Sequence, residues 1–330
     1  MADLIPRPSG RGGERGQLLL IAAFIVAVSF VALALVVNSA IFTENLATRD
    51  DVAGSKDALD HRHEVEQSIE ETMIEINRNN SLDSNLEDLI KSNVDQISTQ
   101  GGVQQSTQGR VVNIIFDDWI EGKKIAQDDI SDFTNVTTKE DWTVVEDVSR
   151  IRNYKINITS DSNIPDIGSL NDPYKIVVEG IGGNDWNLTI EKESLPGNNN
   201  ILVEVNPETE SPEKCTSEFD GSLVLDITGG TIGGEPCHAL RRLTDGTPMW
   251  LGTGATPDYD IKFENGHRIE GTYSFIVDEF ANEVSGNMGS TGNGPYTKVA
   301  IYGTAVRYQY YTDDIGYDTL IRVAPGEVPP

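Results

Sequence analysis

The feature that most constrains this chain is a long apolar run close to its N-terminus. Leu18 to Val37 is twenty residues long, and only Ser29 within it is polar. At about 1.5 Å per residue, a helix of this length spans roughly 30 Å, the thickness of a bilayer's hydrocarbon core. A secretory signal has a shorter apolar region, of about 7 to 15 residues, and a small-x-small cleavage site. The run therefore predicts a retained transmembrane helix over residues 18–42, and a cleaved signal is the disfavoured alternative.

The charged flanks of the run predict its orientation. Three arginines precede it, whereas three acidic residues and a single arginine follow it within residues 44–51. The positive-inside rule then places residues 1–17 in the cytoplasm and the C-terminal bulk of the chain outside the cell. We accordingly expect a single-pass protein of the cell membrane whose first partner is the lipid bilayer.

Two downstream features agree with an extracellular location. The only two cysteines, Cys215 and Cys237, can form a disulfide outside the cell, although two separate buried thiols are the alternative. Four sequons for N-glycosylation also follow the run. Their acceptor residues are Asn79, Asn135, Asn157 and Asn187.

The charge of the chain excludes one class of partner and suggests an environment. Its formal net charge is −28, from 53 acidic and 25 basic residues, which argues against nucleic acid as a partner. The acids are spread along the sequence without long blocks, so a disordered acidic tail is disfavoured. Scarce lysine (11 residues) with abundant Asp and Glu resembles proteins of halophilic archaea. In molar salt the Debye length is roughly 3 Å, which screens repulsion between surface carboxylates.

A short motif in front of the apolar run carries a family resemblance. Arg15-Gly16-Gln17-Leu18, followed by an uncharged apolar helix, resembles the archaeal class III (prepilin) signal. The resemblance implies that a prepilin peptidase cuts after Gly16 and that the helix packs against other pilin-like subunits. Ile21 occupies the fifth mature position, where many pilins carry Glu. The segment as a whole resembles an uncharacterised family of haloarchaeal pilin-like membrane proteins, which implies no particular activity.

The region after the run has a helical pattern over residues 43–100. Val65, Ile69, Met73 and Ile76 recur at helical spacing and form one narrow apolar stripe, which predicts a stalk helix or a helix packed on a following domain. A second helix is expected from a cap at Ser81 to a stop at Gly101-Gly102. Its apolar face consists of Leu82, Leu86, Leu89, Ile90, Val94 and Ile97.

From residue 110 onward the pattern changes to short strands separated by Gly, Pro and Asn clusters. This predicts a mainly β, sandwich-like extracellular region, and α+β for the whole chain. The Pro- and Glu-rich stretch 204–214 is the best internal boundary, giving a first β unit at 110–206 and a second unit, or a continuation of the same sandwich, at 207–330. The expected strands are 111–116, 154–159, 174–179, 186–191, 201–205, 222–227, 259–263, 272–278, 298–311 and 319–323.

No pattern for catalysis or for a cofactor is apparent. The four histidines lack zinc-ligand spacing, and neither a nucleophile elbow nor a phosphate-binding loop is present. Paired carboxylates such as Asp117-Asp118 are better explained as solvated surface than as a glycosidase site. Calcium is the one ligand left open, at the Asp-rich stretches 128–132 and 313–318.

These features predict a non-catalytic, pilin-like surface protein with a structural or assembly role. The alternative is an unprocessed single-pass protein whose outer β region binds a ligand or partner, as an adhesin or sensor would. The two differ in one peptide bond, Gly16–Gln17, which is cut in the first and intact in the second.

Overall fold

A computed structural model describes most of the chain beyond the N-terminal run. The described residues are 30, 33, 56–79, 85–180, 185–195, 198–207, 211–241, 258–278, 281–282, 284, 286–289, 294–313 and 315–327. Phe30 and Leu33 are helical, and the rest of the predicted transmembrane helix lies outside this set. None of the helices among the described residues is both long and apolar enough to cross a bilayer.

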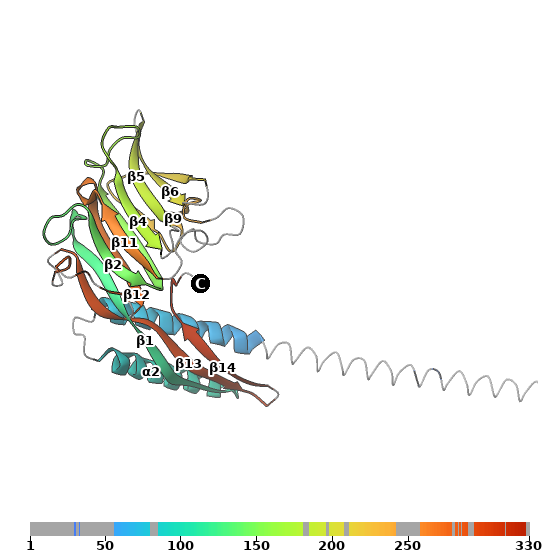
Figure 1. Ribbon diagram of the computed structural model, residues 1–330. Coiled ribbons are helices and arrows are strands. Elements are labelled where there is room, and N and C mark those ends of the chain that lie inside the picture. Colours follow the sequence, from blue (N-terminus) through green and yellow to red (C-terminus); the bar gives the residue numbers. More distant parts are fainter. Residues whose placement is uncertain are drawn as a thin grey trace, which may run out of the picture. The chain divides into compact units, whose positions relative to one another are not determined.

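The chain divides into two compact units, one formed by residues 1–61 with 311–316 and the other by residues 62–310 with 317–330. The second unit contains nearly all the secondary structure that follows. Its helices and two β-sheets are drawn in Figure 1.

Two helices begin the described part of the chain. The first covers residues 56–79, and its predicted apolar stripe is confirmed because Val65, Ile69 and Met73 are buried. The second helix, α2 (Leu86–Ser106), buries Leu86 and Ile90 and lies against strand β1. Both helices therefore pack on the β region, as amphipathic helices of a globular domain do.

The predicted end of the second helix is wrong. The helix continues through Gly101-Gly102 to Ser106, and Asn85 precedes its first residue, while Ser81 lies outside the described residues. A Cβ atom added to Gly102 would lie 3.3 Å from the carbonyl oxygen of Val112. The glycine thus permits a close approach between helix and strand, a role that the sequence pattern does not separate from a helix stop.

The larger sheet has eight strands in the order β10-β9-β8-β3-β12-β1-β13-β14. Its centre is antiparallel: β12 pairs with β1 on one side and with β3 on the other. The strands are β1 (Val111–Asp132), β3 (Ile151–Ser160), β8 (Leu223–Asp226), β9 (Thr231–Ile232), β10 (Glu235–Pro236), β12 (Glu270–Asp278), β13 (Tyr296–Tyr311) and β14 (Gly316–Val323).

The smaller sheet has six strands in the order β2-β11-β4-β5-β6-β7. A short 3-10 helix, Gly266–Arg268, joins β11 of this sheet to β12 of the larger one. The strands are β2 (Trp142–Val148), β4 (Tyr174–Gly180), β5 (Trp186–Leu195), β6 (Asn198–Pro207), β7 (Glu213–Glu218) and β11 (Tyr259–Glu264).

One hydrophobic core joins the two sheets. It combines alternate residues of β3 and β12 with alternate residues of β4, β5, β6 and β11. At its centre, Phe133 and Phe263 both lie edge-to-face against Tyr273, with ring centroids 4.9 and 5.2 Å apart. Because strands of each sheet alternate between this core and the opposite face, the period-two patterns in the sequence are accounted for.

The mainly β prediction is confirmed, with three corrections. β1 is 22 residues long rather than six, because its first half lies against α2 and its second half pairs with β12. β2 and β7 were not predicted, since their patterns are interrupted by charged residues. The stretch 204–214 separates no domains: Glu204 pairs with Lys214 across the β6–β7 hairpin, and both sheets contain strands from 110–206 and from 207–330.

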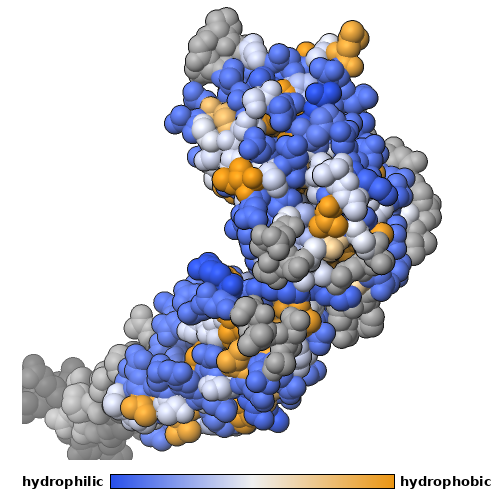
Figure 2. Space-filling view, turned by 90° about the vertical axis from the view of Figure 1, so that its left-hand side faces the viewer, coloured by the Kyte–Doolittle hydropathy of each residue, from blue (hydrophilic) through white to orange (hydrophobic). Residues whose placement is uncertain are grey.

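The face of the molecule drawn in Figure 2 is predominantly hydrophilic, and its hydrophobic residues form small separate patches. This distribution fits a chain whose 53 acidic residues are spread along the sequence. Apolar side chains buried in the core are therefore the main source of stability.

Candidate functional site

The structure describes some of the site residues predicted from the sequence, and others lie outside the described part of the chain. The processing motif Arg15 to Leu18 lies outside the described residues. Cys215 and Cys237 form a disulfide, with their Cα atoms 5.6 Å apart. The bond links β7, at the edge of the smaller sheet, to the segment after β10, at the edge of the larger one. It therefore ties two sheet edges together, and loop-closure entropy predicts a contribution of about 3 kcal/mol.

The four sequon asparagines have different environments. Asn79 is exposed near the end of the first helix, and Asn157 and Asn187 are half-buried within β3 and β5. Asn135 is only 3% exposed, and its amide nitrogen donates to Asn287 Oδ1 at 2.8 Å. Its side-chain oxygen accepts from the backbone nitrogens of Thr137 and Lys139. Asn135 thus stabilises a turn in the fold, an environment that disfavours an attached glycan.

The residues considered for metal binding do not converge. Within the described ranges, no group of three or more His, Cys, Asp or Glu side chains is placed to hold an ion. The stretch 128–132, expected as a loop, is part of β1, and Asp128 accepts a hydrogen bond from Tyr296 at 2.6 Å. Asp318 lies in β14 and forms a two-point ion pair with Arg307, with both distances 2.9 Å.

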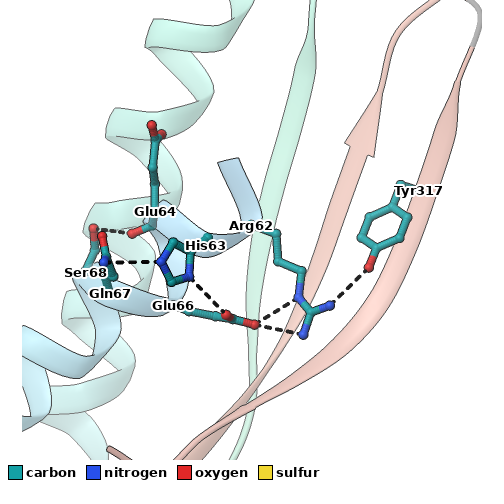
Figure 3. A network of polar contacts seen from close by, with 7 residues as sticks. All are labelled: Arg62, His63, Glu64, Glu66, Gln67, Ser68 and Tyr317. Atoms are coloured by element: carbon teal, nitrogen blue, oxygen red, sulfur yellow. Dashed lines mark hydrogen bonds and ion pairs between the residues drawn. The ribbon is translucent and has the colours of Figure 1, made fainter. Parts of the chain in front are cut away.

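The first helix is held to the larger sheet by polar as well as apolar contacts. Arg62 donates to the hydroxyl of Tyr317 on β14 at 3.5 Å and to Glu66 one turn along the helix at 2.9 Å (Figure 3). Further along the helix, the buried Asn77 makes a reciprocal pair with the backbone of Ile301 in β13. Its amide donates to Ile301 O at 2.9 Å, and its oxygen accepts from Ile301 N at 2.8 Å.

Beside this Asn77 contact is a cavity of about 270 Å³ between the first helix and the larger sheet. Four of the chain's 25 basic residues line it, and no acidic residue does. Arg78 comes from the helix, Lys124 from β1, and Arg152 and Lys155 from β3. In a chain with twice as many acids as bases, this concentration of positive charge is the most distinctive feature among the described cavities. We call the cavity lined by these four residues the basic cavity.

Arg152 is the central member of the basic cavity. Its side chain is fully buried, and its two terminal nitrogens donate to Pro325 O at 3.0 Å and Ile301 O at 2.6 Å. Its Nε has no hydrogen-bond partner among the described residues. Burial lowers the pKa of Arg152 to about 10, although Tyr302, Glu327 and Glu70 act in the opposite direction. A buried guanidinium that lacks a direct carboxylate partner is costly for the fold.

The other three cations differ in how far they are neutralised. Lys155 forms an ion pair with Asp226 at 3.1 Å. Lys124 lies 6.0 Å from the ring centroid of Tyr296. Within the described part of the chain, no carboxylate oxygen lies within 4.0 Å of a side-chain nitrogen of Lys124, Arg78 or Arg152. The four basic residues and the one paired carboxylate, Asp226, therefore leave the basic cavity with a formal net charge of about +3.

A β-bulge brings two of the cations to the same cavity. Arg152 and Lys155 are three residues apart, and in a regular strand this spacing would place them on opposite faces. The register between β3 and β12 shifts between Ser274 and Ile276, at the point where Asn153 adopts a left-handed φ of 53°. The extra residue reverses the alternation, which is a known use of bulges. Tyr154 then faces the core while Arg152 and Lys155 both line the cavity.

Sequence reasoning missed the basic cavity. Its members are separated by up to 77 positions, no short motif contains them, and no pattern marks Asn153 as a bulge. The one usable signal is that Arg152 stands in a run of strand-forming residues next to Ile151 and Tyr154. A charge in such a position suggests a buried arginine.

Taken with the fold, these features define a mainly β chain in which an N-terminal helix packs on one of two sheets. A family of unknown function (DUF7261) is similar to this chain over residues 12–132. The matched region covers the apolar run, both helices and all of β1. No curated protein matches the chain. No solved structure matches it either.

Proposed function

We propose that this protein is a membrane-anchored, pilin-like cell-surface subunit of a halophilic archaeon, with a structural or assembly role rather than a catalytic one. The apolar run anchors it in the bilayer, and the acidic β region faces salt-rich medium. Its partners are the lipid bilayer, a prepilin peptidase and further copies or relatives of the subunit.

The observation that carries the proposal is the helix that follows the apolar run in the sequence and packs on the β region. The helix at 56–79 begins 19 residues after Val37, and it buries its apolar stripe against the β region. Arg62 and Asn77 add polar contacts to β14 and β13. Among the described residues, the first element after the apolar run is therefore a helix packed on the β region. The span matched by DUF7261 contains both parts, which supports treating them as one functional unit.

The mature N-terminus tests the proposal. Mass spectrometry of the protein purified from membranes should find Gln17 as the first residue. Gly16→Val should block processing, because the peptidase in the class III pathway cuts after a small residue at this position. A mature chain that still contains Arg15 would exclude the pilin route.

The basic cavity favours a second candidate, an unprocessed single-pass protein whose outer region binds a ligand. The two candidates separate when surface filaments are sheared from cells. Recovery of the protein in the filament fraction favours the subunit, whereas recovery only in the membrane fraction favours the ligand-binding surface protein.

A further inference from the structure

We infer that the basic cavity is a binding site for a small oxyanion, meaning a carboxylate, sulfate or phosphate group on a molecule no larger than a single sugar acid. This inference does not depend on how the N-terminus is processed. It concerns a site on the β region to which the proposed structural function assigns no role.

The basic cavity holds positive charge without a carboxylate partner for three of its cations. Arg78, Lys124 and Arg152 meet at one cavity without a carboxylate within ion-pair distance in the described part of the chain. Glu327 and Glu70 act on Arg152 only from beyond ion-pair distance, and its guanidinium carbon lies 5.6 Å from the ring centroid of Tyr302. A bound anion can supply the missing charge and, in a partly desolvated site, forms stronger hydrogen bonds than it does in water.

Arg152 has one buried donor without an acceptor among the described residues. Arg152 uses both terminal nitrogens on backbone carbonyls that fix its position, while its buried Nε stays without a partner. Buried donors in folded proteins nearly always have an acceptor, so this donor is available to an acceptor from outside the chain. An oxyanion provides several acceptor atoms for Arg152, Lys124 and Arg78 at once, whereas a single water molecule does not.

The backbone of β3 is shaped so that the cations line one cavity. The bulge at Asn153 is what allows Arg152 and Lys155 to line the same cavity, and Ser274 of β12 adds a neutral hydroxyl beside them. Bulges are over-represented next to functional sites because they re-aim side chains. The cavity volume of about 270 Å³ lies just below the usual range for small-molecule sites, about 300 to 1,000 Å³. That size suits an inorganic oxyanion or one sugar acid.

Isothermal titration calorimetry on the full-length, detergent-solubilised protein tests the inference. Sodium sulfate, sodium phosphate and sodium glucuronate are titrated separately at a constant, molar NaCl concentration, so that only replacement of chloride is measured. At least one of the three should bind saturably at one site per chain. Tighter binding of sulfate or phosphate identifies a dianion site, and tighter binding of glucuronate identifies a sugar carboxylate.

The variants Arg78→Gln and Lys124→Gln should each weaken this binding at least tenfold, because each removes a cationic donor. Lys91→Gln on the exposed face of α2 is the matched control and should bind as the wild type does. Arg152 also donates to Pro325 and Ile301, so Arg152→Gln is expected to disturb the fold and does not decide the question. Circular dichroism verifies that the other variants are folded.

Amine-reactive labelling provides a test on the unaltered chain. The bound anion should protect Lys124 and Lys155 from modification and leave Lys91 unprotected, as measured by mass spectrometry of the labelled peptides. The inference is overturned if none of the three anions binds saturably. It is equally overturned if Arg78→Gln and Lys124→Gln bind like the wild type, or if the anion leaves the labelling of Lys124 unchanged.

Discussion

At the scale of single residues, the C-terminal segment and Arg152 depend on each other. Pro325 O accepts from the Arg152 side chain, and Gly326 O accepts from the backbone nitrogen of Asn153 at 3.4 Å. The backbone of Glu327 pairs with that of Arg152 in an isolated antiparallel β-bridge. The segment thereby closes one side of the bulge that shapes the basic cavity. Substitutions in these few residues should therefore lower the stability of the fold more than substitutions at an ordinary chain end.

Gly326→Ala should destabilise the protein more than an ordinary Gly-to-Ala change at positive φ. Gly326 has a φ of 68°, and an added Cβ atom would lie 2.2 Å from Asn153 Oδ1. Gly168→Ala is the control, since its φ is 74° but open space surrounds the new Cβ. The control should lose about 1 kcal/mol in denaturant unfolding, and Gly326→Ala should lose more, because the Asn153 side chain must move aside. Equal losses would mean that the segment adapts without strain.

Glu327 should make the protein sensitive to acid. Burial would raise the pKa of Glu327, but hydrogen bonds from Arg322 and Tyr302 outweigh burial and lower its pKa below the usual 4.5. A carboxyl with a depressed folded-state pKa stabilises the fold above its unfolded pKa, and this contribution is lost as pH falls through the folded value. The unfolding free energy of the wild type should therefore fall more steeply below about pH 4.5 than that of Glu327→Gln. Parallel curves would contradict this assignment.

Glycan occupancy should follow exposure at the sequons. Asn79 is exposed, whereas Asn135 is buried and its amide nitrogen is already hydrogen-bonded. We expect glycopeptide mass spectrometry to find a glycan on Asn79 and none on Asn135. Asn135→Ala should instead lower stability by about 1 to 3 kcal/mol, since the turn loses its acceptor. A glycan on folded Asn135 would refute the exposure argument.

At the scale of elements, the first helix is the described element that follows the apolar run and packs on the β region. Its buried side chains alternate with exposed ones, so neighbouring residues serve as controls for each other. Met73 is fully buried, whereas the adjacent Ile74 is 38% exposed. The same comparison is possible in α2, where Ile90 is buried and Leu89 is exposed.

Met73→Ala should cost about 2 to 5 kcal/mol of unfolding free energy, because it leaves a cavity between helix and sheet. Ile74→Ala should cost clearly less, since much of its side chain stays in solvent. Thermal or denaturant unfolding in molar NaCl measures both. If the two substitutions cost the same, the helix does not pack on the sheet as described.

At the scale of the whole molecule, the charge of −28 is the dominant property. Like charges on a compact surface repel one another, and this repulsion opposes folding unless it is screened. The Debye length is about 10 Å at 0.1 M salt and about 3 Å at 1 M, so molar salt removes most of the long-range repulsion.

Lowering NaCl from about 3 M to about 0.1 M should therefore lower the Tm of the protein by many degrees. A variant in which exposed acids are neutralised (Glu71→Gln, Glu87→Gln and Asp95→Asn) should depend less on salt, since fewer charges repel. Differential scanning calorimetry of both proteins across the salt series is the measurement. A Tm that does not change with salt would remove the main support for the halophilic environment.

Local patterns were sufficient for most of the elements. Period-two alternation located strands such as β3 and β5, because a strand between two environments must alternate. Helical spacing located the buried stripe around Ile69. Patterns failed where a residue served a distant partner: Gly102 permits the approach of β1, and Glu204 pairs with Lys214 across a hairpin that resembled a linker.

The sequence by itself determined the mainly β class, the apolar run, the acidic surface and which two cysteines were available to pair. All of these depend on composition or on residues close together in the chain. Only the tertiary structure decided that one core joins the two sheets and that four basic residues meet at one cavity. The physical reason is that register and bulges, here the single left-handed residue Asn153, control which face each side chain occupies. No local pattern carries that information.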